Sequence, residues 1–228
     1  AHEPRILPTK IQSIKTFSDK VNGKAGYISF SGGPKQNMIR DLILENRSCR
    51  RFDATYKIVQ ETLLEMVDTA RYVASGMNYQ PLRYLISVEP EKNKQIYSAL
   101  MMGGAKLWRE PYESERPTGY IIILGDTTVP THSLGIDTGI AAQTILLQAR
   151  ECGLAGCIVG IVKHDVIRQA FDIPERYRVI IVIALGKSTD RVIIEEGGPE
   201  VAQALYRDAD DIQHVGKRLL KDVVLNQP

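Results

Sequence analysis

The chain has 228 residues, of which 43% are hydrophobic and 25% charged, and its formal net charge is +2. This length and composition are typical of a globular protein with one large domain or two small ones and a sizeable core. The small net charge argues against nucleic acid or an anionic membrane as a partner, and no apolar run reaches the length of a membrane span.

The three cysteines, Cys49, Cys152 and Cys157, are odd in number and form no CxxC motif. This pattern favours free thiols in a reducing compartment, so we expect a cytoplasmic protein. Cys49 lies inside a basic cluster, where a thiol pKa can fall. Nothing in the sequence pairs with it, and we expect all three cysteines to be small fillers of the core.

The N-terminal part of the chain differs from the rest. Residues 1–37 contain many glycines and prolines and show little hydrophobic periodicity. They predict an irregular extension with one short strand at residues 27–30, ended by a turn cluster at residues 31–34.

Hydrophobic periodicity begins near residue 38. Apolar residues at helical spacing predict two helices, and the pair Ser75-Gly76 stops the second of them. The elements predicted in this half are a helix from residue 38 to the basic cluster, a helix over 58–74, a strand over 83–88, a helix around 91–102 and an irregular loop over 108–117.

The second half predicts a buried sheet with helices between its strands. The apolar run at residues 120–124 is bounded by glycines and predicts a central strand buried on both faces. A helix over 136–151 is apolar nearly all round, so it must be buried in a core or between subunits. Further elements are a strand over 156–161, a helix over 164–171 and a buried strand over 179–185. The alternation indicates a mixed α and β protein with a mostly buried central sheet.

The C-terminal tail, residues 191–228, is more polar than the preceding part. It predicts a strand at residues 191–195 and a hairpin around Tyr206 and Val215, with an acidic tip at residues 208–211. The tail either packs on its own subunit or embraces a partner subunit, and the sequence alone leaves both arrangements open.

Several common catalytic and nucleotide-binding motifs are absent from the sequence. The chain contains no GxxxxGK[ST], HExxH, GxSxG or GxGxxG. Its four histidines show no metal-ligand spacing, so we expect no metal site.

The basic cluster contains groups that suit a phosphate. Arg47, Ser48 and Arg50 can converge on one phosphate, because guanidinium groups give charge-assisted bidentate hydrogen bonds and a hydroxyl adds a donor. The plainer interpretation is a solvated basic helix end, which the helix dipole favours. Taken alone, the cluster fits that plainer interpretation better.

A second polar group follows one helix later. The turn Asn78-Tyr79-Gln80-Pro81 can present amide groups to the edge of a flat heterocycle. Its plainer interpretation is an ordinary helix-to-strand connection held by Gly76 and Pro81. A phosphate-binding cluster together with an amide-lined turn indicates a phosphorylated aromatic cofactor.

These two motifs and three further sequence blocks downstream make residues 38–190 resemble the FMN-dependent nitroreductase family. The blocks occur in the family's order and spacing. They are Asn46-Arg47-Ser48-Cys49-Arg50-Arg51-Phe52, the turn Ser75-Gly76-Met77-Asn78-Tyr79-Gln80-Pro81, Gly139-Ile140-Ala141-Ala142-Gln143, Gly153-Leu154-Ala155-Gly156-Cys157-Ile158-Val159-Gly160, and Ala184-Leu185-Gly186-Lys187.

The resemblance implies an α+β fold with a central, mostly antiparallel sheet flanked by helices. It also implies a homodimer with two FMN sites at its interface, in which residues 38–190 form the FMN-binding domain. The implied activity is ping-pong transfer of reducing equivalents from NAD(P)H to a nitro compound, a quinone or a related small-molecule acceptor. Because the cofactor carries this chemistry, we expect no catalytic acid or nucleophile.

The resemblance also assigns roles to particular residues. Arg47, Ser48 and Arg50 would bind the FMN phosphate and ribityl chain. The flavin ring would be lined by Ser75, Asn78 and Gln80. The backbone of Val159 and Gly160 would donate N–H groups near flavin N5 and O4, and Lys187 would add a phosphate contact.

The sequence departs from the family pattern in three places. Asn46 replaces the first arginine of the usual pair, Leu82 replaces an aromatic residue, and only Lys187 and Arg191 supply the basic residues expected beyond the last buried strand. Two alternatives therefore stay open: a flavin-dependent dehalogenase-type enzyme of the same superfamily, or a flavin storage or sensing protein without turnover.

Overall fold

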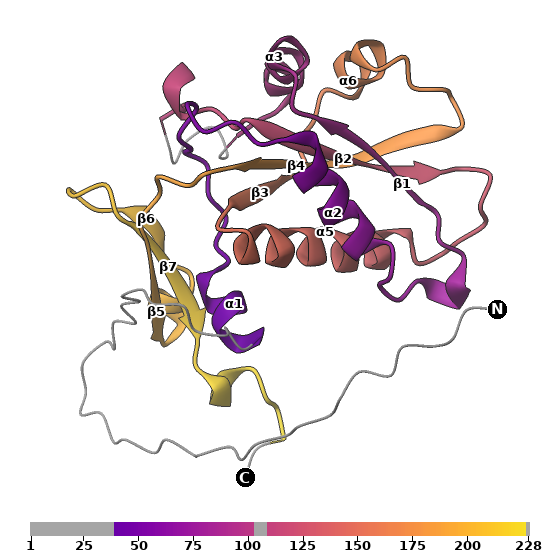
Figure 1. Ribbon diagram of the computed structural model, residues 1–228. Coiled ribbons are helices and arrows are strands. Elements are labelled where there is room, and N and C mark those ends of the chain that lie inside the picture. Colours follow the sequence, from indigo (N-terminus) through magenta and orange to yellow (C-terminus); the bar gives the residue numbers. More distant parts are fainter. Residues whose placement is uncertain (1–38, 103–108, 227–228) are drawn as a thin grey trace, which may run out of the picture.

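The computed structural model describes residues 39–102 and 109–226 (Figure 1). The extension predicted for residues 1–37, its strand at 27–30 and the first residue of the loop predicted over 108–117 lie outside the described residues. Within the described ranges, no helix is both long and apolar enough to cross a membrane.

Helices and strands alternate along most of the described chain. In chain order they are α1 (Ile39–Glu45), α2 (Gln60–Ala70), the 3-10 turn η1 (Gly76–Asn78), β1 (Leu82–Ser87), α3 (Pro90–Ala99), η2 (Glu113–Glu115), β2 (Gly119–Asp126), α5 (Leu134–Glu151), β3 (Ala155–Val159), α6 (His164–Ala170) and β4 (Tyr177–Gly186). The C-terminal elements are β5 (Val192–Gly197), α7 (Pro199–Ala202), β6 (Leu205–Arg207), β7 (Gln213–Arg218) and η3 (Leu220–Asp222).

The central sheet has the strand order β1-β2-β4-β3, and each neighbouring pair is antiparallel. The apolar run predicted as a central strand is β2, and all 8 of its residues are buried. In this register Ile122 lies opposite Leu85 of β1 and Val182 of β4. The predicted α+β fold with an antiparallel sheet flanked by helices is confirmed.

Two helical layers cover the two faces of the sheet (Figure 1). Ile121 and Ile123 of β2 belong to the cluster formed with α2 and α5. Tyr120, Ile122 and Leu124 belong to the cluster formed with α3 and α6. Successive side chains of a strand point to opposite faces, so a strand that is apolar at every position needs cover on both sides.

The long apolar helix α5 is buried on one face. Ala141, Ala142 and Ala149 are fully buried, and these small side chains let the helix lie close to the sheet. The side chains of Ile136 and Ile140 are 68% and 38% exposed. Within one chain, the sheet-facing side of α5 is buried as expected. The opposite side of α5 exposes apolar side chains.

Several predicted elements extend beyond the observed ones, most clearly two helices and one strand. α2 ends at Ala70 instead of residue 74, α3 ends at Ala99 instead of 102, and β3 ends at Val159 instead of 161. The shortening of α3 and β3 has one cause. Leu100 forms a bridge with Val162, and the N–H of Met101 donates to the carbonyl of Ile161 at 3.2 Å.

The C-terminal tail forms a separate small sheet with the order β5-β7-β6 (Figure 1). β5 and β7 are parallel, whereas β6 and β7 form the antiparallel hairpin that the sequence predicts. His214 of β7 is buried between Glu195 and Asp208, with its ring nitrogens 2.8 and 3.0 Å from their carboxylate oxygens. Tyr206 stacks on the His214 ring at a centroid distance of 4.6 Å.

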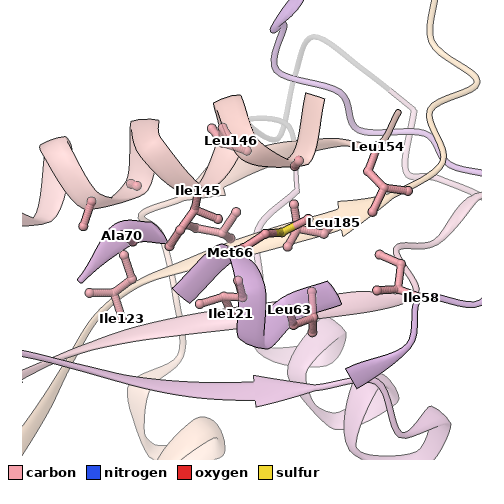
Figure 2. Packing of buried hydrophobic residues seen from close by; sticks show 14 residues of the cluster. Ile58, Leu63, Met66, Ala70, Ile121, Ile123, Ile145, Leu146, Leu154 and Leu185 are labelled. Atoms are coloured by element: carbon pink, nitrogen blue, oxygen red, sulfur yellow. The ribbon is translucent and has the colours of Figure 1, made fainter. Parts of the chain in front are cut away.

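Replacing Leu63 with alanine tests the packing of α2 on α5 and the sheet (Figure 2). Leu63 is fully buried, so we expect the free energy of unfolding to fall by about 2–5 kcal/mol. Leu64 is its neighbour on the same helix and is 49% exposed, so Leu64→Ala serves as the matched control and should change stability by about 0.5 kcal/mol or less. Chemical denaturation measures both, and equal losses would contradict this packing.

The environment of His214 predicts a pH-dependent C-terminal sheet. Hydrogen bonds with Asp208 and then Glu195 raise the pKa of His214 above its ordinary value. A raised folded-state pKa gives stability that is complete below the unfolded value of about 6.5 and is lost as the pH rises through the folded value.

We therefore expect amide exchange in residues 205–218 to be slowest below about pH 6.5, after correction for intrinsic rates. Protection should then decline at higher pH. The variant His214→Gln should remove this pH dependence, and a wild-type protein whose protection increased with pH would contradict the assignment.

Candidate functional site

The basic cluster lies in an extended segment, residues 47–53, beside β3 and the end of β4. Ser48 forms a parallel bridge with Gly156 of β3, and the N–H of Cys49 donates to the Gly156 carbonyl at 3.0 Å. Phe52 is fully buried and pairs with Ser188 just beyond β4. These contacts attach the segment to the edge of the central sheet.

Glycine at position 186 makes room for this attachment. A Cβ atom at Gly186 would lie 2.7 Å from Cδ1 of the Phe52 ring. The Ala-Leu-Gly block and the phenylalanine that ends the basic motif therefore fit one another sterically.

Two side chains of the segment, Arg47 and Ser48, offer donors to a ligand. Arg47 is partly buried and donates from Nη2 to the carbonyl of Ile43 at 2.6 Å. Its buried Nε has no hydrogen-bond partner among the described residues, and burial lowers the pKa of Arg47. Ser48 is exposed beside it, and Arg50 is partly buried. A buried guanidinium N–H without a partner is costly, so this geometry suits an anion that accepts from it.

The cysteines near this segment are not reactive thiolates. Burial is the main cause that raises the pKa of Cys49 to about 11, and burial also raises the pKa of Cys157. Both are buried fillers, as the sequence predicts. The expectation for Cys152 was wrong, because this thiol is exposed just after the end of α5.

Lys187, Val159 and Gly160 occupy different places around β3. Lys187 is exposed, and its Nζ lies 3.4 Å from the carbonyl of Gly153, just before β3. Val159 is the last residue of β3 and is buried, and Gly160 follows it in an exposed position. Lys187 is therefore on the same side as the basic segment, and Val159 and Gly160 lie at the other end of the strand.

The turn predicted to line a ring is held by an acid that the sequence interpretation missed. Asp137, in the first turn of α5, accepts from the Ser75 hydroxyl at 2.6 Å and from the Gly76 N–H at 3.1 Å. The Ser75 oxygen in turn accepts from the N–H of Gln80 at 2.9 Å. The sequence feature that could have pointed to Asp137 is its position as an acid in the first turn of an otherwise apolar helix.

The backbone of this turn is unusual. Met77, Asn78 and Gln80 all have positive φ values, at 50°, 56° and 50°. A Cβ atom at Gly76 would lie 2.1 Å from the Ser133 hydroxyl, so only glycine fits. The amides of Asn78 and Gln80 are exposed and hydrogen bond to each other at 3.1 Å. Non-glycine residues in this region cost free energy, which the Asp137 contacts offset.

Hydrogen bonding also sets the charge of Asp137. Burial acts to raise the pKa of this carboxyl, but the hydrogen bonds from Ser75, Gly76 and Ser133 together outweigh it and lower the pKa below the usual range. The carboxylate therefore stays ionised under the Ser75–Gln80 turn.

The structure does not bring the two predicted groups together within one chain. The turn lies beside Asp137 at the start of α5. The basic segment lies near the end of α5, where Arg150 pairs with Glu45 of α1 at 2.8 Å. Asp137 and Arg150 both belong to α5, and the helix rise between them corresponds to about 20 Å. Figure 1 shows η1 and α1 at opposite ends of this helix.

Each group borders its own cavity. A cavity of about 510 Å³ beside the basic segment is lined by Arg47, Arg150 and Arg191, together with Glu45 and Asp190. A second cavity, of about 360 Å³, lies between α2 and β1, under the turn that carries Ser75 and Gln80. Among the described residues, no cluster of His, Cys, Asp and Glu side chains is arranged to hold a metal ion.

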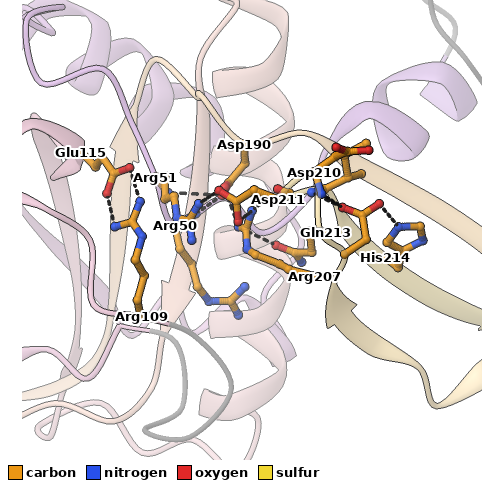
Figure 3. A network of polar contacts seen from close by, with 12 residues as sticks. Arg50, Arg51, Arg109, Glu115, Asp190, Arg207, Asp210, Asp211, Gln213 and His214 are labelled. Atoms are coloured by element: carbon orange, nitrogen blue, oxygen red, sulfur yellow. Dashed lines mark hydrogen bonds and ion pairs between the residues drawn. The ribbon is translucent and has the colours of Figure 1, made fainter.

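A further acid, Asp190, also escaped the sequence interpretation. Its carboxylate is fully buried and accepts from the backbone N–H groups of Arg50 and Arg51 at 2.7 and 3.2 Å. Arg207 of β6 donates to the other carboxylate oxygen at 2.6 Å (Figure 3). No motif marks Asp190, because all three donors are backbone groups or lie in the C-terminal sheet.

The chain belongs to the nitroreductase family. The model of that family, described as "Nitroreductase family", matches residues 43–187. This match includes the basic segment, the Ser75–Gln80 turn, α5 and the central sheet, and it ends before Asp190 and the C-terminal sheet.

Individual relatives agree with this membership. "Putative NAD(P)H nitroreductase YdgI" of Bacillus subtilis (strain 168) is 24% identical over an alignment of 190 residues that covers 68% of this chain and 91% of the relative. A nitroreductase family protein of Clostridium difficile 630 is 26% identical with a TM-score of 0.55, over 68% of this chain and 86% of that structure. An FMN-dependent nitroreductase of Clostridium difficile R20291, at 22% identity and a TM-score of 0.56, shares the fold over 66% of this chain and 87% of its own.

The variant Asp137→Asn tests how the turn is held. An asparagine keeps one acceptor oxygen but places an NH₂ group opposite a donor, so we expect a loss of about 1–3 kcal/mol in the free energy of unfolding. Asp165 also lies in the first turn of a helix, α6, and is exposed, so Asp165→Asn is the matched control and should be near neutral. Chemical denaturation decides, and equal stability of the two variants would show that Asp137 does not hold the turn.

Proposed function

We propose that this protein is an FMN-dependent oxidoreductase that transfers reducing equivalents from NAD(P)H to a nitro compound, a quinone or a related acceptor. The observation that carries the proposal is the partly buried Arg47, whose Nε has no partner among the described residues, beside the exposed hydroxyl of Ser48. Arg47 borders a cavity to which three arginines, Arg47 among them, and two acids contribute. This excess of positive charge favours a phosphate group.

In this proposal the residues bind and orient the cofactor and exclude water from it. Arg47, Ser48 and Arg50 hold the phosphate, and Lys187 contributes a further positive charge on the same side. The backbone N–H groups at Val159 and Gly160 are oriented donors that need no reorganisation. Bound FMN supplies the redox chemistry itself, so no catalytic acid or nucleophile is assigned.

We further propose that the functional unit is a homodimer. Within one chain, the basic segment and the turn with Ser75, Asn78 and Gln80 lie at opposite ends of α5, so one chain does not surround a flavin with both. A second copy supplies the missing group at each site. The exposed apolar side chains of Ile136 and Ile140 on α5, and of Ile158 and Ile161 near the end of β3, support such a contact.

The proposal carries further expectations about setting and substrate. The protein is expected to act in the cytoplasm on a small-molecule electron acceptor, with neither nucleic acid nor membrane as a partner. A flavin-dependent dehalogenase-type reaction, and flavin storage or sensing without turnover, are the competing functions, and the same experiment separates them from NAD(P)H oxidation.

The test is an absorbance spectrum of the purified full chain, recorded anaerobically before and after the addition of NADH or NADPH. We expect flavin bands that bleach with at least one donor and return when a nitro compound or a quinone is added. Bands that persist with both donors would favour the storage, sensing or dehalogenase-type functions. Absence of flavin, together with failure to take up added FMN, would exclude the proposal.

Variants of two arginines link this spectrum to the site. Arg47→Gln removes the partly buried guanidinium and is expected to weaken FMN binding by about tenfold or more. Arg40→Gln removes an exposed arginine from α1 and serves as the matched control, because it changes the net charge equally. Equal affinities for FMN in both variants would show that Arg47 does not contact the phosphate.

A further inference from the structure

Asp190 is the buried centre of a polar network between the basic segment and the C-terminal sheet (Figure 3). One of its carboxylate oxygens accepts from the N–H groups of Arg50 and Arg51, and the other accepts from Arg207. A fully buried carboxylate is unfavourable unless hydrogen bonds and an opposite charge compensate it, and both are present here.

The backbone of the basic segment depends on this carboxylate. Five successive N–H groups, those of residues 49–53, all have acceptors. In chain order these are the Gly156 carbonyl at 3.0 Å, the Asp190 carboxylate at 2.7 and 3.2 Å, the Glu115 carbonyl at 2.9 Å and the Lys187 carbonyl at 2.8 Å. The two N–H groups from the middle of the motif are therefore held by one side chain, and the rest are held by the sheet and a loop.

This arrangement decides which groups of the segment remain for a ligand. Two successive backbone N–H groups aimed at one oxygen form a concave anion site, and Asp190 already fills it. The cofactor phosphate would then contact side chains of the segment rather than these N–H groups, and the positions of those side chains, such as Arg47 and Ser48, follow from the backbone that Asp190 fixes.

The C-terminal sheet holds Asp190 in place. The side chain of Arg207 is only 12% exposed, and its Nη1 donates to the carbonyl of Asp211 at 2.8 Å. The carboxylate of Asp211 pairs in turn with Arg51. The β6–β7 hairpin therefore contacts the basic segment twice, through Asp190 and through Arg51. The residues that it uses lie beyond residue 187, outside the part of the chain that the family model matches.

We propose that Asp190 is a positioning residue for the cofactor phosphate, and that the C-terminal sheet holds it through Arg207. This inference rests on the proposed FMN binding and adds to it a phosphate-specific role for residues outside the matched region. Although Asp190 lines the cavity, its carboxylate is fully buried, so it acts through the backbone of Arg50 and Arg51.

The test compares FMN with riboflavin, which has the same ring but no phosphate. The full chain, freed of flavin, is titrated with each ligand while flavin fluorescence quenching is recorded. In Asp190→Asn an NH₂ group replaces one of the two acceptor oxygens, so either Arg207 or the N–H groups of Arg50 and Arg51 lose their acceptor. We expect this variant to bind FMN about tenfold more weakly than the wild type, and riboflavin within about twofold of it.

Two further variants sharpen the comparison. Asp222 is an exposed acid in η3, so Asp222→Asn changes the net charge equally and should leave both affinities unchanged. Arg207→Gln removes the partner of Asp190 and should reproduce the selective loss of FMN affinity, which keeps the test decisive if Asp190→Asn fails to fold.

The outcomes separate this inference from the proposed function. A wild-type chain that binds neither ligand overturns the FMN proposal itself. A wild-type chain that binds FMN while Asp190→Asn and Arg207→Gln retain its full affinity overturns the role of Asp190. Parallel losses of affinity for FMN and riboflavin in the folded variants also overturn it, because they indicate a general structural role.

If neither variant folds, amide exchange of the wild type decides. FMN must slow exchange at Arg50 and Arg51 more than riboflavin does, and equal slowing overturns the inference.

Discussion

The fold depends on one constraint: the central strand β2 carries apolar side chains on both faces and has no surface that can meet water. Helices must therefore cover the sheet on both sides, with α2 and α5 on one face and α3 and α6 on the other. With both faces covered, the polar groups proposed to bind a ligand lie at the edges and ends of the sheet. The basic segment and the Ser75–Gln80 turn both occupy such places.

Local signals in the sequence predicted the elements, and contacts between distant residues decided where they end. The apolar run of β2 and the pattern of α5 are properties of short windows, so they could be read directly. The ends of α3 and β3 depend on the pairing of Leu100 with Val162, which no short window contains. Asp137 and Asp190 were missed for the same reason, because their hydrogen bonds reach residues 62 and 140 positions away along the chain.

The candidate site shows a different limit of sequence reasoning. Arg47–Arg50 and Ser75–Gln80 lie one helix apart in the sequence, and that proximity suggested a single site. The chain between them crosses the molecule along α2, and the residues of α5 beside the two groups, Asp137 and Arg150, are separated along the helix by roughly 20 Å. Residue types were recognisable from the sequence, whereas their grouping depends on tertiary structure and on the proposed second copy of the chain.

The bridge between Ser48 and Gly156 has a consequence for solubility. β3 is the last strand of the central sheet, and its outer edge would offer unpaired backbone groups beside the exposed side chain of Ile158. Ser48 and Cys49 cover part of that edge with their own backbone. The residues proposed to hold a ligand thus also protect this strand edge, so loosening them would expose a strand able to pair with another molecule. Under this proposal, ligand binding and resistance to aggregation depend on the same few residues.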